Sequence, residues 1–170
     1  MRDTLILIAL ALAAAVVGVF VYFMSGANRG APASSASLAM APGTPVAFTT
    51  LATGTHASVT NPTNYLITSA DELRTLWAMT DANSMVPTVD FSKDAVIAVF
   101  AGTEPTAGFS IAIAQVRDTA ARTVSIVLTE PGGSCIVAQS ETAPYEIVRV
   151  PRTALPLTHT LTTETTSCLQ

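Results

Sequence analysis

Apolar and polar residues alternate along much of the chain after residue 94. Residues 109–114 and 123–128 place apolar side chains at every second position, the period of a strand with one buried face. Residues 95–100 are apolar on both faces and therefore predict a central buried strand. Short β-prone runs between turn residues predict further strands at 46–51, 58–60, 136–139, 145–150 and 158–163. This pattern of about eight strands, without strand–helix–strand alternation, predicts a mainly β fold, an antiparallel sandwich or half-open barrel.

One segment has the period of a helix instead. Ser69 and Glu72 have the spacing of a capping box, in which each side chain binds a free backbone N–H of the first turn. Leu73, Leu76 and Trp77 then recur at helical spacing. The pattern predicts one short amphipathic helix over residues 70–79, with Trp77 on its core-facing side.

The start of the chain predicts a membrane anchor. Residues 4–24 contain no charged side chain, and a helix of that length would be about 31 Å long, enough to cross a hydrocarbon core. A cleaved signal peptide is the alternative, because Ser25-Gly26-Ala27 offers a small-residue cleavage site. Residues 25–45 are rich in Ala, Ser, Gly and Pro and predict a disordered tether, leaving residues 46–170 as the β domain.

Charge and composition exclude several classes of function. Residues 44–170 contain six Lys or Arg and eleven Asp or Glu, so the domain lacks the positive surface that nucleic acids require. Two His and two Cys are too few for a zinc or iron–sulfur site within one chain. We therefore expect no metal, no small-molecule cofactor and no nucleic-acid partner.

The two cysteines predict a disulfide. Cys135 follows a Gly-Gly turn, and Cys168 lies near the C-terminus of the sequence. An exported domain with two cysteines favours pairing, and closing this loop would stabilise the fold by about 4 kcal/mol in the chain-entropy model. Two free thiols, with Cys135 buried as a small apolar residue, are the alternative.

The search for catalytic residues yields little. The sequence has no G-x-S-x-G motif, and His56 and His159 both lie in Thr-rich segments typical of exposed strands and loops. The candidate contact site is instead the loop at residues 103–109, because loops at strand ends often carry binding residues. Its candidate binding residues are Pro105, Thr106, Gly108 and Phe109; the alternative is a plain turn in which Phe109 enters the core.

Three segments resemble a known family. They are Val89–Gly102, Pro105–Ile111, and Pro131–Val137 continuing to Pro144–Pro151. In order and spacing they are similar to the C-terminal domain of PrcB-type protease-complex subunits, over about residues 85–151. The family pattern has Gly-Gly-Tyr where this chain has Ala107-Gly108-Phe109. The resemblance implies an exported, non-enzymatic accessory subunit whose partner is a protease.

Residues 105–109 also resemble the Pro-Thr-Thr-Gly-Tyr loop of chagasin-type cysteine-protease inhibitors.

The sequence as a whole predicts a single-pass membrane protein with its domain on the extracytoplasmic side, or a secreted one if the N-terminal segment is cleaved. The predicted function is to bind and stabilise or modulate an envelope or secreted protease. The alternatives are direct inhibition through the 103–109 loop and a structural envelope module.

Overall fold

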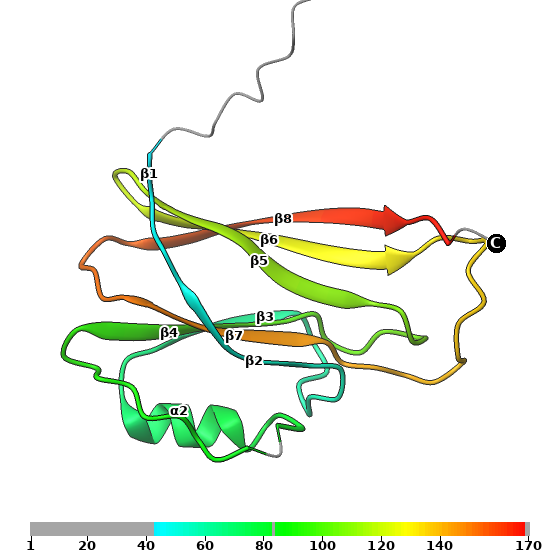
Figure 1. The fold of residues 1–170 in the computed structure, drawn as a ribbon, viewed down its shortest axis with the longest axis horizontal. Coiled ribbons are helices and arrows are strands. Elements are labelled where there is room, and N and C mark those ends of the chain that lie inside the picture. Colours follow the sequence, from blue (N-terminus) through cyan, green and yellow to red (C-terminus); the bar gives the residue numbers. More distant parts are fainter. Residues whose placement is uncertain (1–42, 83, 169–170) are drawn as a thin grey trace, which may run out of the picture. The chain divides into compact units, whose positions relative to one another are not determined.

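Two four-stranded sheets and one helix make up the part of the chain that the computed structural model describes, residues 43–82 and 84–168. Sheet A has the order β1 (Thr44–Pro45), β5 (Ser110–Asp118), β6 (Arg122–Pro131), β8 (Leu157–Thr166). Sheet B has the order β2 (Thr49–Gly54), β7 (Tyr145–Pro151), β4 (Asp94–Phe100), β3 (Thr63–Ile67). Figure 1 shows the sheets stacked face to face, with helix α2 (Ala70–Trp77) on the far side of sheet B. The fold is therefore an open sandwich and not a closed barrel.

Most neighbouring strands are antiparallel, as predicted, but β8 is not. It runs parallel to β6, with Arg122 opposite Leu157 and Pro131 opposite Thr166. The connection from β7 crosses from sheet B to sheet A, so β8 enters the sheet from the same end as β6. This crossover is a long-range arrangement that no local pattern in the sequence encodes.

The main core lies between the two sheets. Its side chains come from the inward faces of β4, β5, β6 and β7, where alternate residues point to the same side. The fully buried members are Ile97, Val99, Val116, Val124, Val148 and Val150. The alternation predicted for residues 109–114 and 123–128 is thus explained by one buried and one exposed face of sheet A.

A second core lies between sheet B and α2. Leu73, Leu76 and Trp77 of the helix pack on Val96 and Phe100 of β4, so the β4 side chains are buried on both faces. The double burial confirms the central strand predicted from its continuous apolar run. Trp77 also donates an indole N–H bond of 3.1 Å to the Ser84 carbonyl, which satisfies its polar atom within the core.

The helix begins at the predicted cap. The Ser69 hydroxyl accepts the backbone N–H of Glu72 at 3.3 Å, and the Glu72 carboxylate accepts the Thr68 N–H at 2.8 Å. The return bond therefore reaches one residue before the cap. These hydrogen bonds lower the pKa of Glu72, with the Thr68 N–H as the largest cause. The helix ends at Trp77, two residues before the predicted end.

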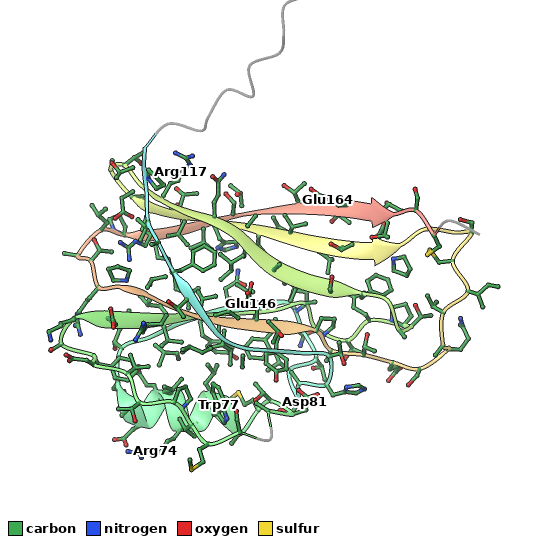
Figure 2. All side chains as sticks on the ribbon, in the orientation of Figure 1. Arg74, Trp77, Asp81, Arg117, Glu146 and Glu164 are labelled. Atoms are coloured by element: carbon green, nitrogen blue, oxygen red, sulfur yellow. A yellow bond between two sulfur atoms is a disulfide. The ribbon has the colours of Figure 1, made fainter. Side chains whose placement is uncertain are left out.

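A buried carboxylate joins the sheets. Glu146 on β7 lies between them (Figure 2) and accepts the Ile113 N–H at 2.5 Å and the Thr50 hydroxyl at 3.0 Å. Both partners border irregular positions, because the pairing registers of β5 and β2 shift directly after Ile113 and Thr50. Glu146 thus satisfies a donor that the bulge in β5 leaves free, and it links sheet B to sheet A.

Several predicted boundaries differ from the structure. Residues 58–60 and 136–139 were predicted as strands and have no strand pairing, whereas the strand at 63–67 was not predicted. Thr44 and Pro45, assigned to the tether, pair with β5. The described residues include no helix long and apolar enough to cross a membrane. The predicted spanning segment, residues 4–24, lies outside the described residues.

Candidate functional site

A cleft of about 490 Å³ opens between the two sheets, along the edge formed by β3 and β8. Its floor consists of buried apolar side chains, most of them from the main core and one, Phe100, from the second core, and its rim is mostly polar. The apolar lining residues are Phe100, Ala101, Ile111, Ile126, Leu128, Leu157 and Leu161. The cleft arises because the edge strands β3 and β8 do not close the sandwich as fully as the central strands do.

The strand registers decide which β8 residues face the cleft. In a ladder, residues opposite each other point to the same side of the sheet. His159 and Leu161 lie opposite Val124 and Ile126, whose side chains belong to the main core. Both therefore face the cleft, and Leu161 is 55% exposed there.

On β3, Thr63 and Asn64 line the cleft, whereas Leu66 lines a smaller neighbouring hollow that Leu157 also borders. Leu66 lies opposite Ile97 of β4, which faces the main core, so Leu66 points toward sheet A. It is 48% exposed, because no strand of sheet A covers it fully. Large apolar side chains are therefore exposed on both walls of the same edge, a feature of interaction surfaces.

The electrostatics of the cleft are simple. Among its lining residues, the ionisable side chains are Glu104 and His159. Burial, together with the negative charge of Glu130, raises the pKa of Glu104. The cleft can accommodate apolar groups beside a cation or a hydrogen-bond donor at its Glu104 end. It brings no nucleophile next to a base, so its geometry suits binding.

The predicted contact loop at residues 103–109 borders this end of the cleft through Glu104. The backbones of Glu104 and Thr142 exchange two hydrogen bonds of 2.7 and 3.0 Å, and the Thr142 hydroxyl donates to the Thr106 carbonyl at 3.0 Å. Pro105 and Gly108 are exposed, and Thr106 is half-buried. The loop is therefore held against residues 138–142, with Pro105 presented to solvent.

Gly108 and Phe109 lie at the end of this loop, where the chain enters sheet A. Gly108 has a φ of +92°, and a side chain there would meet Val137 at 3.1 Å and Pro131 at 3.2 Å, so a residue larger than Gly would be strained. Phe109 is half-buried at the entry to β5. Phe109 belongs to neither of the two cores, and its role in binding a partner stays a prediction.

The disulfide fixes the segment beside this loop. Cys135 is bonded to Cys168 with a Cα–Cα distance of 5.1 Å, as the sequence predicted. The Gly132 N–H adds a bond of 2.9 Å to the carbonyl of Thr166 at the end of β8. Next to the disulfide, Ile136 is 97% exposed. The cross-link therefore ties the loop after β6 to the end of β8 and presents one large apolar side chain to solvent.

The arrangement around His56 does not form a catalytic relay. Nδ1 of His56 lies 2.9 Å from the Thr55 hydroxyl and 3.5 Å from the Asp81 carboxylate. A nucleophile and an orienting acid must contact different nitrogens of the ring, and here both approach the same one. Asp81 also accepts the Tyr145 hydroxyl at 2.8 Å, and burial followed by this bond raises the pKa of Tyr145. The cluster is a structural contact between sheet B and the loop after α2.

Sequence reasoning did not find the cleft. His159 was predicted to be an exposed polar residue, and neither Leu66 nor Leu161 was singled out. Leu157, His159 and Leu161 do share the period of one strand face, which was a usable signal. The cleft also requires β3, which lies across from β8. This strand was not predicted, because the turn-forming residues Asn61 and Pro62 directly precede it.

The comparisons with known proteins concern the centre of the domain. No curated protein and no solved structure matches the chain. One protein family does match a segment of the chain. This segment begins at the central strand β4 and ends with β7, and it includes the 103–109 loop, Cys135 and Glu146. It starts ten residues later than the resemblance predicted from the sequence, and it confirms that resemblance. Residues 95–151 match the family described as PrcB C-terminal.

Proposed function

We propose that this protein is an accessory subunit that binds a protease and stabilises or modulates it without catalysing a reaction itself. The match of residues 95–151 carries the proposal, because at the level of the family it indicates an accessory subunit of a protease complex. In this proposal the partner is a protease, as the family match suggests, and residues 4–24 anchor the chain or direct its secretion, so that the domain lies outside the cytoplasm.

The cleft between the sheets and the exposed Ile136 support a binding role. Both present apolar surface to solvent in a domain that already has two well-filled cores. Such surface lowers the free energy of association when a partner covers it. The backbone bonds and the disulfide around residues 103–142 hold this surface in place, which reduces the entropy lost on binding.

Affinity capture tests the proposal. The full chain, tagged after Gln170, is isolated in a mild detergent from the cells that produce it, and an untagged chain provides the control. We expect a protease at a near-stoichiometric ratio to the chain, and a lower amount of that protease in cells lacking the chain. The absence of any protease above the untagged control would overturn the proposal.

Direct inhibition is a second candidate function. One observation favours it: the loop at 103–109 is braced by residues 138–142 while Pro105 stays exposed. If this loop enters a protease cleft, the purified chain should lower the turnover of the captured protease, and Pro105→Ala should weaken the inhibition. Pro156→Ala is the matched control, because Pro156 is also exposed but precedes β8 at the opposite end of sheet A. Unchanged turnover would leave the stabilising role.

A further inference from the structure

The outer edge of β8 lacks the devices that usually protect a sheet edge. β8 pairs with β6 over ten residues without a register break, and all ten are exposed. Its sequence has no Lys, Arg or Pro and only one carboxylate, Glu164. By contrast, β1 has two residues, β3 has five, and β2 has an irregular register. A long, flat and nearly uncharged edge is a template for a further strand.

The same edge carries the exposed apolar residues of the cleft. Leu157 and Leu161 face the cleft from β8 and are 37% and 55% exposed, and Leu66 of β3 borders a smaller neighbouring hollow together with Leu157. A strand added to β8 would extend sheet A over the mouth of the cleft. It would then satisfy the free backbone groups of β8 and remove these leucines from water at once.

We propose that the added strand is β8 of a second copy of this chain, paired antiparallel about a two-fold axis at Leu161. In this register Leu161 lies opposite itself, His159 opposite Thr163, and Leu157 opposite Thr165. Each pair points to the same side of the sheet, so all cleft-facing residues of both copies stay on the cleft side. The two sheets A become one sheet of eight strands, and the interface is self-complementary.

The charges along the edge favour this orientation. Arg152 lies beside Leu157 at one end of β8, and Glu164 and Glu130 lie at the other, where Thr165 donates to Glu130. Antiparallel pairing brings the arginine end of one copy to the acidic end of the other and places Glu164 opposite Thr158. Parallel pairing in register would place Glu164 against its own copy, which is unfavourable.

The overall charge acts in the opposite direction. The domain has eleven acidic and six basic side chains, so two copies repel each other at long range. Salt at physiological concentration screens this repulsion beyond about 8 Å, whereas pairs in contact are screened less. We therefore expect association to be weaker in low salt than at physiological ionic strength.

Site-specific photo-crosslinking tests the proposal in the full chain. Two differently tagged copies are expressed together, each with p-benzoylphenylalanine in place of Thr162, which lies next to the axis on the face away from the cleft. Irradiation should yield an adduct carrying both tags, with the cross-link mapped to residues 158–164 of the other copy. Adducts with other proteins alone, or no adduct, would overturn the proposal whether or not a protease is captured.

A pair of matched variants provides the second arm. Leu161→Lys places two ammonium groups against each other at the axis and removes apolar contact, so the adduct should fall about tenfold. Met85→Lys makes a similar change at a residue that is 92% exposed in the loop after α2, and should leave the adduct unchanged. Leu161→Thr, which suits an exposed strand, should reduce the adduct about threefold without impairing folding. Equal adduct in all variants would overturn the proposal.

Discussion

Sheet B and sheet A have the same number of strands but very different surroundings. Sheet B is covered by sheet A on one face and by α2 on the other, and the central strand β4 is buried along nearly its whole length. Sheet A has one covered face, and its edge strand β8 is exposed throughout. The domain therefore derives most of its apolar burial from sheet B and leaves the edge strand of sheet A exposed to solvent. The disulfide restrains the part of sheet A that packing holds least.

The largest effect is expected from removing that disulfide. Cys135→Ser together with Cys168→Ser frees the end of β8 and the loop after β6 in one step. We expect a loss of about 3–4 kcal/mol in the free energy of unfolding, because the unfolded chain is no longer restricted by the closed loop. Urea unfolding of the full chain in a mild detergent measures this loss.

Hydrogen exchange in the same double variant sharpens the comparison. Amides of β8 should exchange faster relative to those of β4, because β8 loses its covalent anchor while β4 keeps both covered faces. Adding a reductant should change the wild-type chain and leave the double variant unchanged. Equal acceleration in both strands would contradict the view that the disulfide restrains sheet A in particular.

The next effect compares the outer faces of the two sheets. Val96 lies on the face of sheet B that α2 covers and is fully buried, whereas Val127 lies on the open face of sheet A and is only half-buried. Val96→Ala should cost about 2–3 kcal/mol, because it leaves a cavity under the helix. Val127→Ala should cost less than about 1 kcal/mol. Similar costs in denaturant unfolding would contradict the view that the outer face of sheet A is open.

The contact that joins the sheets should rank third. Glu146→Gln replaces a carboxylate that accepts two hydrogen bonds with an amide whose nitrogen must face a donor. We expect a loss of about 1–3 kcal/mol, since one buried donor loses its partner. Glu141→Gln, the same change at an exposed residue, provides the control and should be neutral. A neutral Glu146→Gln would show that the bulge at Ile113 does not depend on this carboxylate.

The sequence predicted the parts of this structure that depend on local patterns. The run at 95–100 identified the central strand, and the Ser69 cap with its helical leucines identified α2. The same local signals wrongly predicted a strand at 136–139. This β-prone run forms a loop, because the Gly-Gly turn and the disulfide at Cys135 precede it. They also missed β3, which is a strand because it pairs with β4.

The cleft could not be predicted, because it depends on two long-range facts. β8 returns to sheet A parallel to β6, and β3 lies at the matching edge of sheet B. The pattern of Leu157, His159 and Leu161 shows only that these residues share one face of a strand. Whether that face borders a cleft depends on how sheet B lies against sheet A, which the order of all the strands decides. The predicted loop at 103–109 was close to the cleft because both are built at the end of β4.

The smallest effect concerns Glu104, at the end of the cleft between the sheets. Burial and the nearby Glu130 raise the pKa of Glu104, so the folded state holds this proton more tightly than the unfolded chain does. Stability must then fall as the pH rises from the unfolded pKa of about 4.3 through the higher folded pKa. Glu104→Gln removes this loss and should stabilise the full chain at pH 7 by less than about 1 kcal/mol, with no gain at about pH 3.5.

Glu130→Gln should stabilise at pH 7 in the same direction but less, because it removes the secondary cause of the shift. Urea unfolding at the two pH values measures both variants. An equal gain at both pH values would mean that shape, and not charge, limits the packing around Glu104. A loss at pH 7 would mean that the carboxylate makes a favourable contact. Either outcome would contradict the view that burial and Glu130 disfavour the charged form of Glu104.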